Sequence, residues 1–533
     1  MKKTLLSLLI VFVLGGVLYF YNLGGWDLWN PDEPRYAQIT REMLQGEGWI
    51  IPHLNSEVYL NKPPLFFWLI ASAAKAIGEM NESAARLPSA IFALLTLMLT
   101  FMLGKRLFNE KAGLFAALIL ATNFEFFWLA RRANIDATLT FFTTAGILFF
   151  YVGFYRQRKR WIFYSLAYCA MALGVLAKLH VAFIVPLLVI GGYFLIQREF
   201  TFFKDPSHVP GMILFLVIIG GWLSLTYFSG GEDYLSGLLY HKTTWRLFKK
   251  PAHHRPLYYY LLHLPSDFLP WSIFLPSALI YGLSTKGRRR EFTFLFFWFS
   301  VIFVILSLAK AKRDLYLLPV YPAVALMVGY LLEELPLGAE GRGKRLVSVP
   351  LYILIIALFL LAIGFPIVAA LIGPRYIERP LGISLVCSLI LGGGGVLALL
   401  AHLHRRIDLP FYLLVAMMFT FGLFSTARVF PEIDRYKSAR PLSQAIVSVM
   451  RPTDQLGVYQ IEGADFNYYT GINPIRRFEQ KEELKNFLRS PQRVLCIMRE
   501  RHYRILENDP TIQISVAVRG QVGHKRLVVI SNR

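Results

Sequence analysis

The stretch Trp26–Leu65 reads WDLWNPDEPRYAQITREMLQGEGWIIPHLNSEVYLNKPPL and lies between long apolar segments. Charge is concentrated near its beginning, where Asp32, Glu33 and Arg35 stand within four successive positions. At its other end Lys62 precedes a Pro-Pro pair. Ionisable side chains at a membrane boundary are costly unless they pair, face water or bind a polar ligand. This stretch is therefore a candidate functional site, and an ordinary hydrated loop is the alternative.

The composition of the whole chain indicates a membrane protein. Of the 533 residues 55% are hydrophobic and 17% are charged, whereas about a quarter are charged in soluble proteins. The formal net charge is +22, but Lys and Arg fall in short clusters between apolar runs, which is typical of cytoplasmic loops. No basic face is continuous enough to follow a phosphate backbone, so nucleic-acid binding is not expected.

The cysteines argue against a metal-binding or disulfide-rich protein, and the N-terminus argues against a cleaved signal peptide. Cys169 and Cys387 lie in hydrophobic segments and Cys496 in a polar tail, so no spacing indicates a metal site or a disulfide framework. The apolar residues 4–21 lack the small-residue cleavage site of a signal peptide and end in bulky aromatic residues, so we expect an uncleaved transmembrane helix.

The basic residues predict how the chain crosses the membrane. Lys2 and Lys3 hold the N-terminus in the cytoplasm, so the following loop faces the periplasm or the cell exterior. The apolar run 65–78 is shorter than the roughly twenty residues of a spanning helix and is expected at the interface. Alternation then predicts about thirteen transmembrane helices with the C-terminus outside. They are expected near residues 4–21, 87–103, 112–130, 138–155, 161–177, 181–197, 210–228, 266–284, 292–308, 315–332, 347–372, 380–401 and 409–427.

The sequence divides into two domains. Residues 1–427 are expected to form the polytopic α-helical membrane domain, whose outer loops 22–86 and 229–265 carry the candidate site. From residue 428 the chain has the composition of a small soluble domain, in which short β-branched runs alternate with helical stretches. This alternation predicts a periplasmic α/β or α+β domain over residues 428–533.

The predicted topology gathers many ionisable side chains at the outer membrane face, and cations outnumber acids among them. A phosphate held at the lipid surface would explain this excess, although contact of scattered cations with lipid headgroups is an alternative. The set comprises Asp32, Glu33, Arg35, Lys62, Arg131, Arg132, Asp136, Lys178, Arg246, His253, His254, Arg255, Lys310, Lys312, Arg313 and Arg428.

Carboxylates on two separate outer segments suit a site that binds a sugar between an acceptor and an anionic leaving group. Asp136 opens a helix in ANIDATLTFF, so it can also act partly as the N-cap. The pair His253–His254 lacks the spacing of metal ligands, and a metal site is not expected. The candidate catalytic residues are Asp32, Glu33 and Asp136; the candidate substrate-binding residues are Arg35, Tyr36, Lys62, Arg131, Arg246, His254, Arg255, Tyr259, Lys312 and Arg313.

Six motifs together resemble a known enzyme family. These are PDEPRYA, NKPPLFFWL, AARLPSA, ARRANIDATLTFF, HHRPLYYY and KRDLYLLPVYP. They resemble the bacterial branch of the protein O-mannosyltransferase superfamily, which are integral membrane glycosyltransferases of the GT-C type, and within it the lipid A aminoarabinose transferases. The resemblance implies transfer of 4-amino-4-deoxy-L-arabinose from undecaprenyl phosphate to lipid A phosphate. It also implies that Asp32 and Asp136 are the essential acids and that Lys62 contacts the carrier phosphate.

One position departs from this family. Asn61 stands where aminoarabinose transferases usually have Glu before the lysine, which leaves open the sugar and any metal near that carboxylate. We expect a monomeric glycosyltransferase of the bacterial inner membrane that needs neither nucleotide nor metal. The alternatives are a polyprenyl-phosphate-sugar transferase for another acceptor, such as a protein Ser/Thr hydroxyl or another envelope glycan, a transporter of lipid-linked glycans, and a scaffold. Transporters commonly show internal repeats and charges at the membrane midplane, which this sequence lacks.

Overall fold

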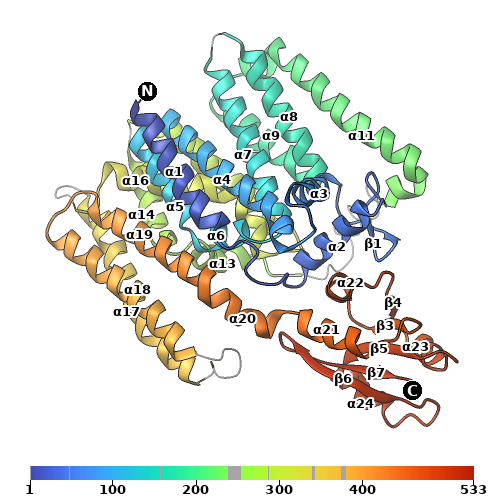
Figure 1. Cartoon of the computed structure of the whole chain (residues 1–533). Coiled ribbons are helices and arrows are strands. Elements are labelled where there is room, and N and C mark those ends of the chain that lie inside the picture. The colour runs from blue at the N-terminus through green and yellow to red at the C-terminus, as the bar shows by residue number, and fades with distance from the viewer. Residues whose placement is uncertain are drawn as a thin grey trace.

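A computed structural model describes residues 2–46, 48–156, 158–237, 254–285, 287–338, 343–371, 373 and 380–533. The candidate residue Arg246 and the histidine His253 lie outside these ranges. Most of the described chain forms a bundle of apolar helices, and a small sheet domain follows at one end (Figure 1). The bundle helices are α1 (Lys2–Phe20), α4 (Glu82–Leu107), α5 (Glu110–Ala121), α6 (Phe124–Ala130), α7 (Ile135–Phe154), α8 (Arg160–Lys178), α9 (Val181–Ile196), α11 (Val209–Ser236), α14 (Leu275–Ser284), α15 (Arg289–Leu308), α16 (Tyr321–Glu334), α17 (Lys344–Leu371), α18 (Pro380–Leu403) and α19 (Leu409–Phe424).

The helices confirm the predicted fold class of a polytopic membrane protein. Among the described residues, 10 helical stretches are long and apolar enough to cross a membrane, or 11 if α5 and α6, bent by 68°, form one span. Two shorter apolar helices, α9 and Trp271–Ser284, match the remaining expected crossings. Helix α3 (Leu65–Ile77) matches the segment expected at the interface. The number of these helices that cross the membrane remains a prediction.

Small residues bring the central helices close together. A Cβ atom on Gly104 of α4 would lie 2.6 Å from the Cα atom of Gly113 in α5. A Cβ atom on Gly329 of α16 would lie 2.7 Å from the backbone nitrogen of Ala116. Such close approach increases van der Waals contact between helices, which is the main source of packing energy in lipid. Helix α16 is accordingly buried at the centre, whereas α17 and α18 form a hairpin at the edge (Figure 1).

The first loop, residues 22–86, folds into compact structure rather than an extended connection. It contains α2 (Asp32–Leu44), the hairpin of β1 (His53–Leu54) and β2 (Glu57–Val58), and α3. The two turn residues of the hairpin, Asn55 and Ser56, have φ of 61° and 59°, as a tight two-residue turn requires. The buried carboxylate of Glu42 accepts both of their backbone N–H groups, at 2.8 and 3.0 Å. The loop is thereby fixed to α2.

A buried ionic cluster attaches the start of α2 to the bundle. The Glu33 carboxylate accepts from the Arg86 guanidinium at 2.8 Å and from Arg132 at 3.3 Å. Backbone N–H groups of Trp29 and Ala133 also donate to it, each at 3.0 Å. Burial would raise the pKa of Glu33, but the two arginines lower it to about 2. Glu33 is therefore an anion that joins the first loop, α4 and the turn before α7.

The C-terminal domain is an α/β sandwich. Its sheet has the order β4-β3-β5-β7-β6, with β3 parallel to β4 and β5 and the other pairs antiparallel. Alternate residues of the central strands enter two apolar clusters, one on each face of the sheet, as the two-residue period of a strand requires. The elements are β3 (Gln455–Tyr459), β4 (Arg476–Phe478), β5 (Val494–Arg499), β6 (Ser515–Val522), β7 (Lys525–Ser531), α21 (Arg440–Val449), α22 (Ala464–Thr470), α23 (Lys481–Leu488) and α24 (Glu500–Leu506).

The boundary expected at residue 428 does not coincide with the end of the preceding helix. Helix α19 continues through a π-helical turn, Ser425–Val429, into α20 (Phe430–Lys437). Hydropathy falls at residue 428 because α20 is polar on one side, whereas the helical backbone continues to Lys437. The sheet domain itself begins with α21.

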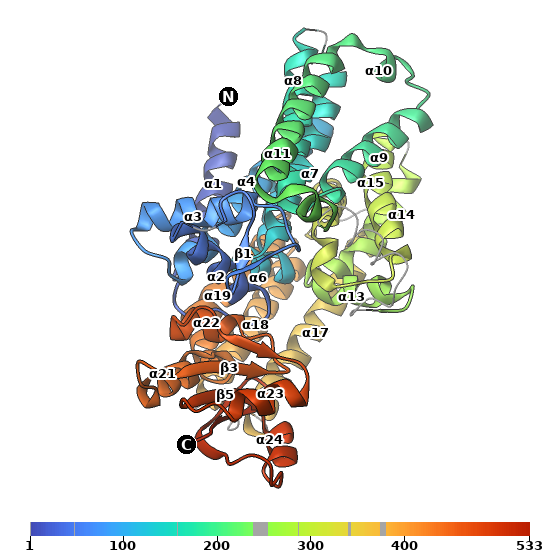
Figure 2. The same cartoon turned by 90° about the vertical axis from the view of Figure 1, so that its right-hand side faces the viewer.

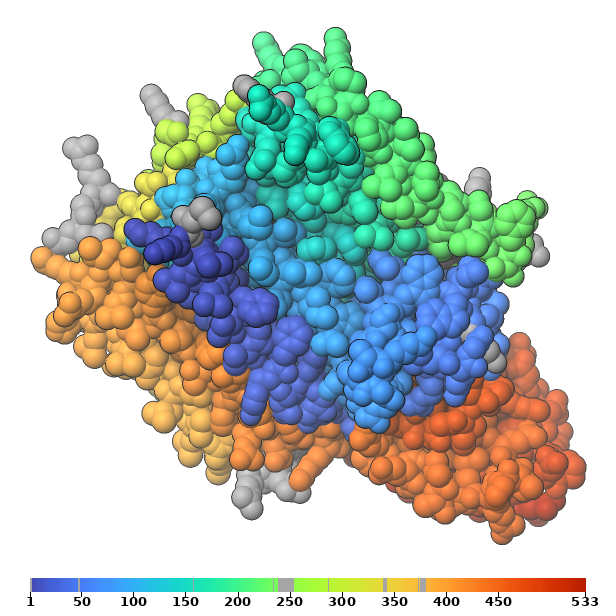
Figure 3. Space-filling model, turned by 45° about the horizontal axis from the view of Figure 1, so that its top comes forward, coloured from blue at the N-terminus to red at the C-terminus, as the bar shows by residue number. Residues whose placement is uncertain are grey.

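The C-terminal domain lies against the first loop (Figures 2 and 3). Asn55 is central to this contact, because its amide donates to the Ile475 carbonyl at 2.9 Å and its amide oxygen accepts from Asn467 at 2.7 Å. The Tyr469 hydroxyl accepts the Leu28 N–H at 2.6 Å. Asp434 of α20 accepts the indole N–H of Trp29 at 2.6 Å and the backbone N–H of Asp27 at 3.0 Å. The first loop is thus held between the bundle and the sheet domain.

We predict that Glu33→Gln destabilises the folded protein by about 3–5 kcal/mol, the usual result of removing one partner of a buried ion pair. Arg86 would remain buried without its anion. Thermal unfolding in detergent measures the effect, and Glu57→Gln, at an exposed position on the same loop, should change stability by no more than about 0.5 kcal/mol. Acidification toward pH 2 should remove the same stabilisation, because the pKa of Glu33 is depressed in the folded state. Equal stability of the two variants would contradict the structural role of Glu33.

Candidate active site

The Asp32 carboxylate, at the start of α2, lies at the centre of the candidate site. Its Oδ2 accepts from an Arg313 Nη at 2.9 Å, and its Oδ1 accepts from an Arg35 Nη at 3.4 Å. Burial would raise the pKa of Asp32, but Arg313, Arg35 and Lys62 together hold it below its usual value. The side chain keeps 14% exposure. Asp32 is therefore an accessible anion surrounded by cations.

Arg35 connects this carboxylate to the C-terminal domain. Its shortest contact is a 2.6 Å ion pair with Glu462, in the loop between β3 and α22. The hydroxyl of Tyr59 lies beside the same guanidinium. Tyr36, the next residue of α2, packs its buried ring against Phe66 and Phe67 of α3. Tyr36 therefore fixes the position of α2, and Arg35 faces the site.

The second predicted acid, Asp136, stands in the first turn of α7. Its carboxylate pairs with Lys178 at the end of α8, and the Lys178 ammonium lies 4.4 Å from the centre of the Tyr316 ring. Arg313 interacts electrostatically with both Asp136 and Asp32, so the structure places both acids around one arginine. The expectation that Asp136 caps its helix is wrong, because the side chain of Asn134 accepts the Asp136 N–H at 2.6 Å.

Lys62 adds a further positive charge at this point. It is partly exposed just before Pro63–Pro64 and α3, and its ammonium interacts electrostatically with Asp32. The adjacent Asn61 is exposed. Lys62, Arg35 and Arg313 therefore surround Asp32 from three separate segments of the chain.

Besides Tyr36, three further predicted site residues have structural roles instead. Glu33 is enclosed by the donors described above, and its side chain is only 1% exposed. Arg131 is fully buried and donates to the carbonyl groups of Leu18 and Tyr21, where it satisfies the C-terminal end of α1. Lys312 is 3% exposed and donates to the carbonyl groups of Ala309 and Arg255. These side chains are already paired inside the protein, so they are not available to a substrate.

Three further predicted residues, His254, Arg255 and Tyr259, lie near the segment that precedes Arg313. His254 forms a β-bridge with Ala311, and the Arg255 N–H donates to the Lys310 carbonyl at 3.3 Å. The side chains of His254 and Arg255 are exposed. The Arg255 guanidinium lies 5.9 Å from the ring centre of Tyr259. The structure thus places these residues at the edge of the candidate site.

Sequence reasoning missed two partners of the site residues. Lys178 was recognised only as one of many outer cations, although its position at a helix end near the membrane surface was a usable signal. Glu462 carried no signal at all, because it lies in a polar loop 427 positions after its partner Arg35. Only packing of the sheet domain on the first loop brings them together.

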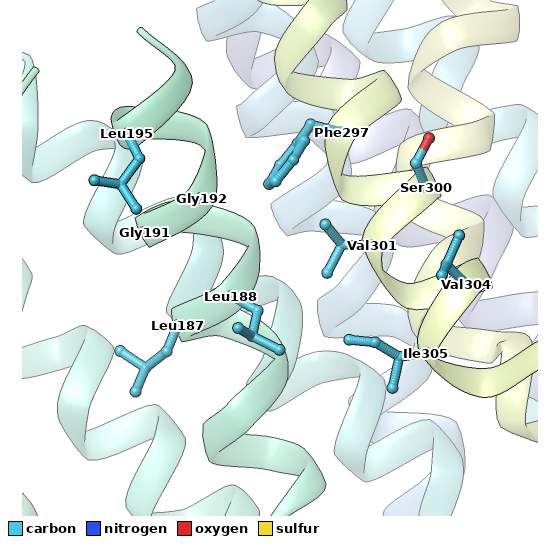
Figure 4. A pocket seen from close by; sticks show the side chains of 10 residues that line it. All are labelled: Leu187, Leu188, Gly191, Gly192, Leu195, Phe297, Ser300, Val301, Val304 and Ile305. Carbon is cyan, nitrogen blue, oxygen red and sulfur yellow. The ribbon is translucent and has the colours of Figure 1, made fainter. Parts of the chain in front are cut away.

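An apolar groove lies between α9 and α15 (Figure 4). Its volume is about 570 Å³, and the Phe297 and Val301 side chains point from α15 toward α9. Helix α15 ends shortly before Arg313, and α9 begins shortly after Lys178. The lining residues are Leu187, Leu188, Gly191, Gly192, Leu195, Phe297, Ser300, Val301, Val304 and Ile305.

Within the described ranges, no group of three His, Cys, Asp or Glu side chains is placed to hold a metal ion. His253, one of the histidines considered from the sequence, lies outside those ranges. Lys62, Arg35, Arg313 and Lys178 form a cation-rich cluster around the two carboxylates of Asp32 and Asp136.

Known proteins are similar to this chain in sequence and in fold. The family model of the dolichyl-phosphate-mannose-protein mannosyltransferases matches residues 2–229. An uncharacterized protein of Aquifex aeolicus is 32% identical over 388 residues, which cover 71% of this chain and 74% of that protein. An undecaprenyl phosphate-α-4-amino-4-deoxy-L-arabinose arabinosyl transferase of Pseudomonas aeruginosa is 30% identical over 396 residues, covering 73% and 70%.

The fold comparison agrees with the sequence comparison. The crystal structure of ArnT from Cupriavidus metallidurans bound to undecaprenyl phosphate has a TM-score of 0.84 with 23% identity, and the match covers 98% of each chain. The sequence relatives confirm the resemblance that six motifs indicated. The chain belongs to the family of the undecaprenyl phosphate-α-4-amino-4-deoxy-L-arabinose arabinosyl transferases, multi-pass membrane glycosyltransferases of the GT-C type.

Proposed function

We propose that the protein transfers 4-amino-4-deoxy-L-arabinose from undecaprenyl phosphate to a lipid A phosphate at the periplasmic face of the inner membrane. The relatives' names supply the donor and the sugar. The observation that carries the proposal is the Asp32 carboxylate with Arg313 at 2.9 Å, Arg35 at 3.4 Å and Lys62 nearby. Such a site offers cations to a phosphate and an anion to an amino sugar.

The reaction exchanges one phosphate oxygen for another at the anomeric carbon. An oxygen of the acceptor forms the new bond to that carbon, while the bond to the carrier phosphate breaks and undecaprenyl phosphate leaves as an anion. A phosphate leaving group is a weak base, so stabilisation of its developing negative charge matters more than protonation. Lys62 and Arg313 are placed to provide that stabilisation, and Lys178, oriented by Asp136, adds to it.

The lowered pKa of Asp32 favours a phosphate acceptor over a hydroxyl acceptor. A serine or threonine hydroxyl must lose its proton during attack, and a carboxylate stabilised by two arginines is a weak general base. A lipid A phosphate is already ionised and needs no base. Asp32 then orients the sugar, for instance by pairing with its ammonium group. This argument ranks transfer to a protein hydroxyl as the second candidate.

The groove between α9 and α15 supports a lipid-linked donor (Figure 4). Nine of its ten lining residues carry no polar side-chain atom, Ser300 being the exception. A polyprenyl chain consists only of apolar carbon units, so it can enter such a groove with a favourable transfer free energy. The groove follows the two helices that lie next to Lys178 and Arg313 in the sequence, so we infer that the phosphate of a chain lying in it is at that end of the helices.

The first prediction about the proposed function separates binding from catalysis at the proposed site. Asp32→Asn should reduce transfer by several factors of ten, each equivalent to about 1.4 kcal/mol of barrier, with unchanged expression. Lys62→Ala should lower turnover and also raise KM for the lipid donor, since it contacts phosphate in the ground and transition states. The assay follows aminoarabinose transfer from the undecaprenyl phosphate donor to lipid A, with Glu57→Gln as the control. Near-normal transfer by Asp32→Asn would reject the site.

A second prediction concerns metals. Cationic side chains can balance the charge of the carrier phosphate, so we propose that transfer requires no divalent cation. Turnover of the purified protein should persist after treatment with a chelator. Loss of turnover that returns on adding a metal ion would contradict this prediction.

A third prediction concerns orientation. We propose that the N-terminus lies in the cytoplasm and the C-terminal domain in the periplasm, because the basic loops then lie inside. We also propose that the protein is a monomer. A reporter fused after residue 440 should be active if it requires the periplasm and inactive if it requires the cytoplasm. The opposite result would reverse the assigned topology and remove the site from the periplasmic face.

A further inference from the structure

Glu462 is presented by a tightly fixed turn of the C-terminal domain. The turn joins β3 to α22, and Gln460 and Gly463 on either side of it have φ of 52° and 79°. The Gln460 amide donates to the Glu479 carbonyl at 3.0 Å, and its backbone N–H donates to the Phe478 carbonyl at 3.0 Å. The turn lies at the carboxyl end of a parallel strand, the edge where α/β sheets usually bind ligands. Here that edge faces α2.

The position of this turn relative to α2 is set by contacts that do not involve Glu462. Helix α22 packs against α2. Six residues after Arg35 on the same helix, Arg41 donates to the Tyr468 carbonyl at 2.6 Å and lies 4.1 Å from the centre of the Tyr468 ring. Asn55 joins the same two regions through Ile475 and Asn467. Domain docking therefore has buried contacts of its own.

The ion pair of Glu462 with Arg35 adds little to that docking. The Glu462 side chain is 53% exposed, and pairs of this kind usually contribute little stability. Its geometry nevertheless directs the guanidinium, which lies 2.6 Å from Glu462 and 3.4 Å from Asp32. Arg35 thus makes its shorter contact with Glu462, and its contact with Oδ1 of Asp32 is long.

We propose that Glu462 is a positioning residue for sugar transfer, which holds Arg35 away from Oδ1 of Asp32 and so keeps that oxygen open to the substrate. The inference rests on the proposed function and extends it, because it gives the C-terminal domain a part in the active site. Without Glu462, the 3.4 Å contact of Arg35 with Oδ1 shortens, so that both oxygens of Asp32 accept close bonds from arginines. A carboxylate held in this way is a poorer partner for the substrate and is harder to protonate.

The test compares Glu462→Gln with Glu483→Gln, an exposed glutamate on α23 of the same domain. Both full-length variants and the unchanged protein are assayed for aminoarabinose transfer to lipid A between pH 2.5 and pH 8, together with their melting temperatures. For Glu462→Gln we expect kcat to fall about tenfold, with KM for the lipid donor within about threefold. We also expect the acid limb of kcat/KM to move to lower pH by about one unit, since an additional cation lowers the pKa of Asp32. Glu483→Gln should match the unchanged protein.

The readouts separate the inference from the function on which it rests. If Glu462 has only a structural role, Glu462→Gln lowers the melting temperature and the rate together without moving the acid limb. That result overturns the inference. Unchanged kcat and an unchanged pH profile in Glu462→Gln overturn it as well. Absence of aminoarabinose transfer by the unchanged protein would instead overturn the proposed function.

Discussion

The buried ion pair between Glu33 and Arg86 is the interaction on which the active end of the molecule depends. Glu33 draws together the first loop, α4 and the turn before α7, and Arg86 also donates to the carbonyl groups of Leu23, Trp26 and Asp27. Two buried charges lose their hydration, so such a pair is tolerable only when hydrogen bonds satisfy both groups. Both groups are satisfied here. The cluster therefore fixes the direction in which α2 begins and, with it, the position of Asp32.

Adjacent acids serve different purposes because their environments differ. The Glu33 side chain is 1% exposed and accepts close bonds on both oxygens, whereas the Asp32 side chain is 14% exposed, with Arg313 at 2.9 Å and Arg35 at 3.4 Å. Both remain ionised, since arginines oppose the effect of burial on their pKa values. A satisfied anion is suited to holding structure, and an accessible one can bind a ligand. The same contrast separates Arg131 and Lys312, which bond to carbonyl groups, from Arg313 and Lys62.

The charged site is assembled from distant parts of the membrane domain, and the sheet domain adds a partner for Arg35. Asp32 and Arg313 are 281 positions apart, and Arg35 and Glu462 are 427 apart. The helices supply the rigid positions of Asp136 and Lys178, and the sheet domain covers the first loop from the other side. A cation-rich site enclosed in this way suits a lipid phosphate, because fixed charges in a region of low dielectric stabilise an anion more than water-exposed charges do.

Hydropathy and loop charge in the sequence already determined the membrane fold, since a spanning helix needs a long apolar run and leaves its signal within about twenty residues. Motifs around Asp32, Lys62 and Arg313 likewise indicated the family and the site. Tertiary structure alone decided which charged groups are available. Glu33, Arg131 and Lys312 stand in the same motifs as the site residues. Nothing in the sequence of these motifs indicates that the three side chains are hydrogen-bonded inside the protein. Lys178 and Glu462 became part of the site only through packing, because an ion pair depends on distance in space and not on position along the chain.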